Sequence, residues 1–229
     1  MARVFVLVHS PSVGPSTWRP VADRLAAAGF ATRVPSLTHV AYGGAPFWPR
    51  IVAAVRAAVA DVPVERPVVL VAHSNAGLLL PVIRAGLTRQ VAASVFVDAT
   101  LPARAGSTPV APPDLVDALR AIATDGLLPR WTDWWDEADV APLFPDPVTR
   151  FIVTAEQPAL PLSYFEQAVP VPAGWDDHPR VYLRFSAAYE PEVREAAARG
   201  WPVAYLPGGH LHQLVDPDAV ARYLLAAAT

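Results

Sequence analysis

A serine and a histidine stand where they could act together in nucleophilic catalysis. Ser74 lies in "VLVAHSNAGLLL", directly between an apolar run and a helical pattern, with the small residues Ala72 and Ala76 two positions before and after it. A turn sharp enough to expose a serine hydroxyl brings the backbone close at those two positions, so only small side chains fit there. The alternative is that Ser74 only caps the helix that follows.

The candidate base lies near the end of the chain. His210, in "YLPGGHLHQLVDP", follows two glycines after an apolar run and precedes the last helical pattern. This context predicts a loop at the carboxyl end of a strand, the edge of a parallel sheet at which Ser74 is also expected. His212, only two residues further on, competes for the same role.

Two carboxylates could orient the histidine and stabilise its charged form. Asp98 follows an apolar run in "FVDATLP", and Glu190 follows another in "SAAYEPE". Each also has a simpler interpretation. Asp98 could form a turn at the end of its strand, and Glu190 could belong to the acidic first turn of a helix, where the helix dipole favours it.

The elements that position these residues are predicted by short β-branched runs, which alternate with helical patterns along the chain. Such alternation predicts a mostly parallel sheet of about six strands with helices on both faces, an α/β fold. Asp216 and Pro217 are the expected cap and first residue of the last helix. The expected strands are Val4–Val8, Ala31–Val34, Val68–Ala72, Val91–Val97, Val181–Ser186 and Pro202–Leu206.

The alternation stops between the fourth and fifth strands. We therefore assign residues 1–98 and 180–229 to the core and residues 99–179 to an inserted helical lid. The lid contains "WTDWWDE", in which helical spacing would bring Trp131, Trp134 and Trp135 to one side. If these rings line a pocket, the substrate is apolar or aromatic. Packing of the lid against the core is the alternative.

Composition excludes several classes of function. The chain has 229 residues and a net charge of −3 without a basic run, which argues against nucleic acid or a membrane surface as partner. It contains no cysteine, and its 18 basic residues are all arginine, so thiolate and lysine Schiff-base catalysis are excluded. We expect no cofactor, no metal site, a cytoplasmic location and a monomer or homodimer.

The elbow "AHSNAG", the strand "VFVDATLP", the inserted lid and "GGHLHQLVDP" together resemble the α/β-hydrolase superfamily. Within it, "LVHSPSVGPSTWRPVADRLAAAGF" is similar to the start of the small methylesterase and hydroxynitrile lyase branch and its bacterial relatives. The resemblance implies Ser74 as nucleophile and His210, seven residues before Pro217, as base. It favours Glu190 as the acid because of its position after the strand preceding that of the histidine, with Asp98 as the alternative.

The loop "HSPSVG" departs from the family pattern. The resemblance implies one oxyanion donor at the N–H of Asn75 and a second at the residue two after His9. That residue is Pro11, which has no N–H, and Ser10 stands where the family has glycine. On this interpretation the proline holds the loop in one shape, and Ser12 provides the second contact.

Three functions are therefore considered. The first is a serine hydrolase that cleaves an ester, lactone or thioester of a small apolar substrate. The second is a lyase, cyclase or isomerase that uses Ser74 and His210 for proton transfer, in which no tetrahedral oxyanion forms. The third is a non-catalytic binding protein for small molecules. In each case we expect His73, Ser10, Pro11 and the three lid tryptophans to line the pocket.

Overall fold

The computed structural model describes residues 3–227 and contains a six-stranded sheet in which every neighbouring pair is parallel. The strand order is β2-β1-β3-β4-β7-β8, which confirms the fold class predicted from the sequence. The strands are β1 (Val4–Val8), β2 (Ala31–Arg33), β3 (Val68–Ser74), β4 (Val91–Ala99), β7 (Arg180–Arg184) and β8 (Val203–Tyr205).

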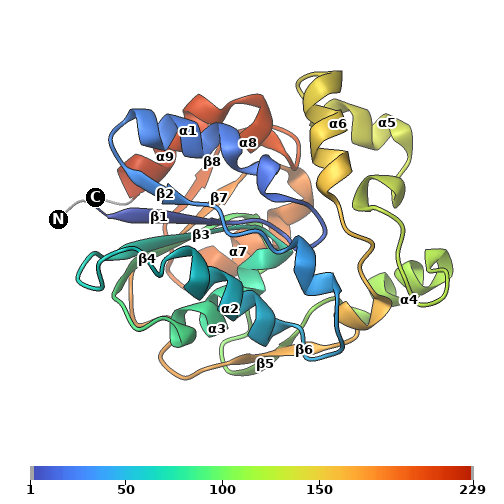
Figure 1. The fold of residues 1–229 in the computed structure, drawn as a ribbon, viewed down its shortest axis with the longest axis horizontal. Coiled ribbons are helices and arrows are strands. Elements are labelled where there is room, and N and C mark those ends of the chain that lie inside the picture. Colours follow the sequence, from blue (N-terminus) through green and yellow to red (C-terminus); the bar gives the residue numbers. More distant parts are fainter. Residues whose placement is uncertain (1–2, 228–229) are drawn as a thin grey trace.

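The central strands are continuous apolar runs because both faces of the sheet are covered. All five residues of β1 are buried, and so are the first six of β3. One face packs against α1 (Arg19–Ala27) and α9 (Pro217–Ala227), and the other packs against α2 (Trp48–Ala58), α3 (Leu80–Gly86) and α7 (Glu190–Ala198) (Figure 1). The helices thus fix the direction of each strand and bring the carboxyl ends to one edge.

The segment expected to form a helical lid is helical only in part. Its helices are α4 (Pro113–Ile122), α5 (Glu137–Val140) and α6 (Pro147–Glu156), and it also contains an antiparallel pair, β5 (Gly106–Pro109) with β6 (Ala168–Val171). In Figure 1 the three helices lie beyond the carboxyl ends of the core strands. The sequence did not predict the antiparallel pair, which is short and rich in proline.

One close contact joins α6 to the loop after β1. Glu156, at the end of α6, accepts a hydrogen bond of 2.8 Å from the N–H of Ser16. A Cβ at Gly14 would lie 2.3 Å from the Glu156 carboxylate, so only glycine permits this approach. The remaining short elements are α8 (His212–Val215) and the 3-10 turns Pro15–Thr17, Thr38–Ala41, Asn75–Leu79, Trp131–Asp133, Ala141–Leu143, Leu162–Tyr164 and Ala187–Tyr189.

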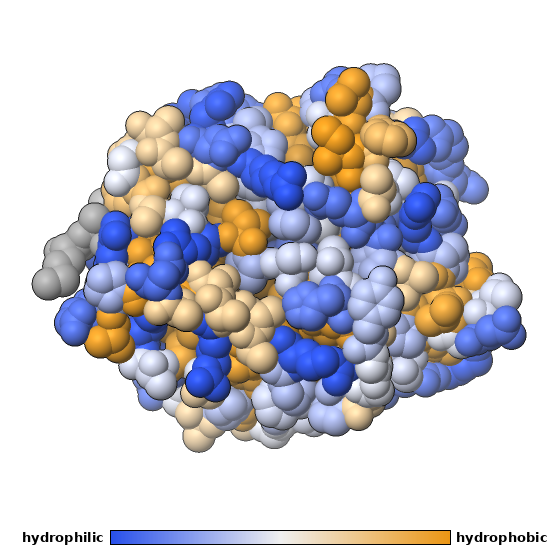
Figure 2. Space-filling view, viewed as in Figure 1, coloured by the Kyte–Doolittle hydropathy of each residue, from blue (hydrophilic) through white to orange (hydrophobic). Residues whose placement is uncertain are grey.

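The outer side of α6 is apolar. Val148, Phe151 and Ile152 are exposed there, and Figure 2 shows apolar side chains gathered over this helix at the upper right. Spacings of three and four residues put the three side chains on one face of the helix. Within residues 3–227, no helix combines the length and apolar character needed to cross a bilayer.

Candidate active site

Ser74 ends β3 in a conformation that L residues rarely adopt. Its φ of 59° and ψ of −135° turn the chain sharply before the 3-10 turn Asn75–Leu79. Ala72 and Ala76 are fully buried on either side of this turn, as their small size predicts. A Cβ at Gly77 would lie 2.3 Å from the carbonyl oxygen of Thr100, so the glycine is required by close packing against the next strand. The turn holds the Ser74 side chain at the edge of the sheet.

The helix after Ser74 is shorter than the sequence suggested. The helical pattern directly after Ser74 predicts one helix from Asn75 to about Arg84, but α3 begins only at Leu80. Pro81 has no N–H to donate to Gly77, the acceptor that a continuous α-helix would use. The N–H of Leu80 donates to Gly77 instead, which is the tighter 3-10 pattern.

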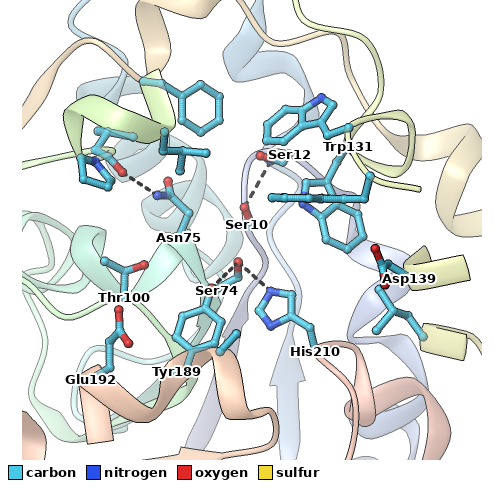
Figure 3. A pocket seen from close by; sticks show the side chains of 18 of the residues that line it. Ser10, Ser12, Ser74, Asn75, Thr100, Trp131, Asp139, Tyr189, Glu192 and His210 are labelled. Atoms are coloured by element: carbon cyan, nitrogen blue, oxygen red, sulfur yellow. Dashed lines mark hydrogen bonds between the residues drawn. The ribbon is translucent and has the colours of Figure 1, made fainter. Parts of the chain in front are cut away.

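The structure brings His210, and not His212, to Ser74. His210 Nε2 lies 3.0 Å from Ser74 Oγ (Figure 3). The ring of His212 packs edge-on against Phe185, with centroids 5.3 Å apart. Of the two candidates, His210 has the geometry required of a base.

Asp98 contacts the other side of the imidazole. Its Oδ2 lies 2.8 Å from His210 Nδ1 and also accepts a hydrogen bond of 2.7 Å from Ser186 Oγ, while Oδ1 accepts from the N–H groups of Phe185 and Ser186. The Asp98 side chain is fully buried. Burial alone would raise the pKa of this carboxyl, but the hydrogen bonds and the charge of His210 outweigh burial and hold the pKa below its ordinary value. Asp98 is therefore ionised and accepts a hydrogen bond from the N–H at Nδ1 of His210.

The preference for Glu190 as the partner of His210 is wrong. Glu190 begins α7 and forms ion pairs with Arg184 and Arg194, at the solvent-exposed side of that helix. Glu190 does follow β7, as the sequence predicted. Its carboxylate, however, binds Arg184 at the end of β7 instead of His210. Asp98, the alternative, reaches His210 from β4.

Tyr189 is a site residue that the sequence analysis did not identify. Its ring stacks on that of His210, with centroids 5.0 Å apart and an angle of 10° between the planes. Its hydroxyl oxygen lies 3.4 Å from Ser74 Oγ. Nothing in "SAAYEPE" distinguishes this tyrosine from a packing residue, because its contacts depend on how the loop after β7 folds back over His210.

The oxyanion candidates lie above Ser74 in Figure 3. Ser10 and Ser12 line the main pocket, as expected, and the Ser12 N–H makes only a long contact of 3.4 Å with Ser10 Oγ. Pro11 is buried and is not among the residues that line the pocket, contrary to expectation. Asn75 lines the pocket, and its side chain binds Val110 O and the hydroxyl of Tyr164.

His73 supports the histidine loop rather than the main pocket. Its Nε2 donates to the carbonyl oxygen of His210 at 2.8 Å, and the two rings lie 4.5 Å apart. Burial lowers the pKa of His73 to about 3, so the ring is neutral. Instead of the main pocket, where it was expected, it lines a small cavity of about 10 Å³ behind Ser74 and His210, a volume that suits one water molecule.

The main pocket is a cavity of about 600 Å³ over Ser74. Trp131, Trp134 and Trp135 all line it, but they lie on and after a single 3-10 turn rather than on a helix. The Trp131 ring is 6.2 Å from that of His210, Trp134 packs edge-on against Phe165, and Trp135 is half exposed. The other lining residues are Ser10, Ser12, Ser74, Asn75, Thr100, Pro109, Val110, Pro112, Leu115, Asp139, Val140, Leu143, Phe165, Ala188, Tyr189, Glu192 and His210.

The charges in this pocket are all acidic apart from the histidine. Asp139 and Glu192 lie on opposite sides of Ser74 in Figure 3, and none of the arginines that the structure describes lines the cavity. Burial raises the pKa of Glu192. Among residues 3–227, no three histidine, aspartate or glutamate side chains are grouped so that they could hold a metal ion.

A serine on a sharp strand–helix turn, hydrogen-bonded to a histidine that an aspartate orients, over a parallel sheet with an inserted segment, defines a class of α/β enzyme folds. Residues 5–223 match the model of the alpha/beta hydrolase family, so the chain belongs to that family. No curated protein matches the sequence.

Solved structures share this fold at low sequence identity. An extracellular alpha/beta-hydrolase from a Paenibacillus species is 15% identical over 98% of both chains, with a TM-score of 0.74. A methylesterase from Arabidopsis is 18% identical over 99% of this chain and 98% of its own, with a TM-score of 0.68. Tomato methylketone synthase I, complexed with 2-tridecanone, is 16% identical over 100% and 98%, with a TM-score of 0.75.

Proposed function

We propose that this protein is a serine hydrolase that cleaves an ester, lactone or thioester of a small, largely apolar substrate. One observation carries the proposal. Ser74 Oγ, His210 Nε2, His210 Nδ1 and Asp98 Oδ2 form a continuous chain of hydrogen bonds of 3.0 and 2.8 Å. This order of nucleophile, base and orienting carboxylate is the arrangement that activates a serine.

The chemistry follows from the protonation states. Because the ionised Asp98 only accepts, Nδ1 of His210 holds its proton and Nε2 is free to accept the proton of Ser74. Ser74 Oγ attacks the carbonyl carbon as that proton moves to His210, and His210 then gives it to the departing oxygen or sulfur. Water repeats the sequence on the acyl-enzyme and releases the acid.

The oxyanion contact is proposed at two residues of the elbow and the loop after β1. The N–H of Asn75, directly after Ser74, supplies one donor, and Ser12 supplies the other in place of Pro11. Support for Ser12 is its place in the pocket lining and its N–H, which has only one long contact. The rigid φ of Pro11 holds this loop in the shape that aims Ser12 at the substrate.

The substrate class is inferred from the pocket. Its volume suits a small molecule, and aromatic and aliphatic side chains make up most of its wall. Two structural neighbours are named as esterases, a methylesterase and a polyneuridine aldehyde esterase, and a third is named as a pyrethroid hydrolase, which supports hydrolysis here as well.

Pro11 favours one alternative. If the chemistry of this site is proton transfer without a tetrahedral oxyanion, a missing donor costs nothing, and the protein is a lyase, cyclase or isomerase that uses Ser74 and His210 as acid and base. A neighbour of the same fold, tomato methylketone synthase I, has been crystallised with the keto acid beta-ketoheptanoate. This second candidate predicts no covalent acyl-enzyme.

Reaction with a fluorophosphonate probe separates the two candidates. A hydrolase labels at Ser74 and cleaves members of a panel of p-nitrophenyl esters, lactones and thioesters. Ser74→Ala and His210→Ala should each remove most of this activity, and the double variant should be little worse than either, because members of one catalytic unit are not additive. His212→Ala is the matched control and should keep near-normal activity. A folded wild-type protein that neither labels nor hydrolyses would overturn the proposal.

A further inference from the structure

Tyr189 is the one residue besides His210 whose side chain comes within hydrogen-bond distance of Ser74 Oγ in the described part of the chain. It ends the 3-10 turn Ala187–Tyr189 and precedes α7. Figure 3 shows Ser74 Oγ between the tyrosine hydroxyl and the imidazole. Burial raises the pKa of Tyr189 well above that of a free tyrosine, so the hydroxyl keeps its proton.

The direction of the Tyr189 contact follows from counting protons. His210 Nδ1 donates to Asp98, which leaves Nε2 as an acceptor, so the hydroxyl hydrogen of Ser74 is directed at Nε2. Ser74 Oγ then has only lone pairs for its other neighbour. In the hydrogen bond of 3.4 Å between the two hydroxyl groups, Tyr189 is therefore the donor and Ser74 Oγ the acceptor.

We propose that Tyr189 is a further catalytic residue, which stabilises negative charge on Ser74 Oγ by this hydrogen bond. The inference rests on the proposed hydrolase function. In the attack, the Ser74 proton passes to His210 Nε2, an electron pair of Oγ forms the bond to carbon, and the carbonyl π pair moves to the carbonyl oxygen. Tyr189 keeps its own proton throughout.

The two half-reactions use this hydrogen bond differently. In deacylation Oγ is the leaving group: the C–Oγ bond breaks, its electron pair returns to Oγ, and His210 gives the proton back. A donor to Oγ assists that departure directly. In the attack the same donor stabilises the developing alkoxide but also occupies a lone pair of the nucleophile, so these two effects offset one another. Loss of the hydroxyl should therefore slow deacylation more than acylation.

A purely positional role would produce a different result. The parallel stacking of Tyr189 on His210 fixes the plane of the imidazole, and phenylalanine would preserve that stacking. Tyr189→Phe thus removes the donor and keeps the ring, whereas Tyr189→Leu removes both. Tyr205→Phe is the matched control, because Tyr205 is half exposed and contacts Arg184 rather than the site.

The test is the pre-steady-state burst of p-nitrophenol from p-nitrophenyl butyrate, with the rate of fluorophosphonate labelling measured in parallel. In Tyr189→Phe we expect deacylation to slow by about 10- to 100-fold, the range for a hydrogen bond to a charged group. Labelling should change by less than about threefold, and acyl-enzyme should accumulate. Tyr205→Phe should match the wild-type protein.

Three results would overturn the catalytic role of Tyr189, and each has a different consequence. If the wild-type protein hydrolyses esters but Tyr189→Phe deacylates at an unchanged rate, Tyr189 has no catalytic role and the proposed hydrolase function still stands. If deacylation slows only in Tyr189→Leu, Tyr189 is a positioning residue and not a catalytic one. A wild-type protein without labelling or hydrolysis removes the proposed function and this role together.

Discussion

Ser186 donates two hydrogen bonds to Asp98, one from its N–H to Oδ1 at 3.0 Å and one from Oγ to Oδ2 at 2.7 Å. The second bond shares its acceptor with His210. A buried carboxylate is costly unless donors surround it, and here the chain after β7 supplies them. The orienting acid therefore lies on β4, while the loop after β7 provides the donors that keep it charged.

Replacing Asp98 and Glu190 by their amides should have very different effects on kcat. Asp98→Asn should lower kcat by about 10⁴-fold, because an amide no longer selects the His210 tautomer that accepts from Ser74. Glu190→Gln should change kcat by less than about threefold, since the ion pairs of Glu190 are with Arg184 and Arg194 and neither involves Ser74 or His210. Steady-state kinetics on one activated ester measures both.

Ser186→Ala serves as the intermediate case for this comparison. It removes one donor to Asp98 and should lower kcat by about tenfold, the range for a single hydrogen bond to a charged group. A loss in Glu190→Gln as large as that in Asp98→Asn would contradict the geometry of the site.

The oxyanion contact is tested in the loop after β1. Ser12→Ala removes the hydroxyl and keeps the N–H. It should lower kcat by about 10²-fold or more with little change in KM if the hydroxyl is the donor, because such a contact strengthens mainly in the transition state. Near-normal activity would assign the contact to the N–H. Pro11→Ala restores an N–H and should maintain or raise activity on an activated ester. Ser36→Ala, an exposed serine outside the site, is the control.

The outcome for Pro11→Ala also separates the two candidate functions. A variant that gains esterase activity while it loses the natural reaction indicates that the wild-type loop avoids an oxyanion. The lyase or isomerase function would then replace the hydrolase.

Charge should affect substrate choice. Asp139 and Glu192 face the cavity without an arginine beside them, so a substrate carboxylate would meet only like charge there. An ester with an anionic acyl group should have a kcat/KM about tenfold or more below that of its neutral isostere. Glu192→Gln should reduce this difference in kcat/KM between the two esters. Equal rates for the two esters in the wild-type protein would exclude electrostatic selection.

Two buried histidines should make stability depend on pH. Burial lowers the pKa of His9 to about 4 and that of His73 to about 3, from an ordinary value of 6.5. Above that ordinary value neither the folded nor the unfolded state is protonated. Below it the unfolded state binds protons first, so the free energy of unfolding falls as pH is lowered, until each histidine reaches its folded pKa.

The expected slope is about 1.4 kcal/mol per pH unit for each histidine. Urea unfolding between about pH 6 and about pH 5 measures it. His73→Gln should be less stable than the wild-type protein but should lose one histidine's share of the slope. His39→Gln, at an exposed position, should retain the full slope.

The sequence predicted the core well because each core element carries its own local signal. Short runs with β-branched residues predicted all six strands, and the Asp216–Pro217 pair predicted the start of α9, where Asp216 accepts from the N–H of Ala219. Small residues around Ser74 and the glycines before His210 marked two members of the site.

The choice between Asp98 and Glu190 required long-range information. Asp98 lies near the end of β4 and Glu190 follows β7. Both strands end at the same edge of the sheet, and local spacing cannot show which carboxylate turns inward. Two sets of contacts determine which acid reaches His210. Arg184 binds Glu190, and the N–H groups of Phe185 and Ser186 donate hydrogen bonds to Asp98. The sequence did not predict Tyr189 as a site residue for the same reason, because its stacking on His210 joins segments that are distant in the chain.

The placement of the acid on β4 has an engineering consequence. Ser74, Asp98 and His210 all belong to the six-stranded core, whereas most of the pocket wall comes from the segment between β4 and β7. The reactive groups and most of the pocket wall thus lie in different stretches of chain, joined at two strand ends. Replacement of that segment by one from a relative would exchange the substrate-binding wall as a cassette and leave the Ser74–His210–Asp98 chain intact.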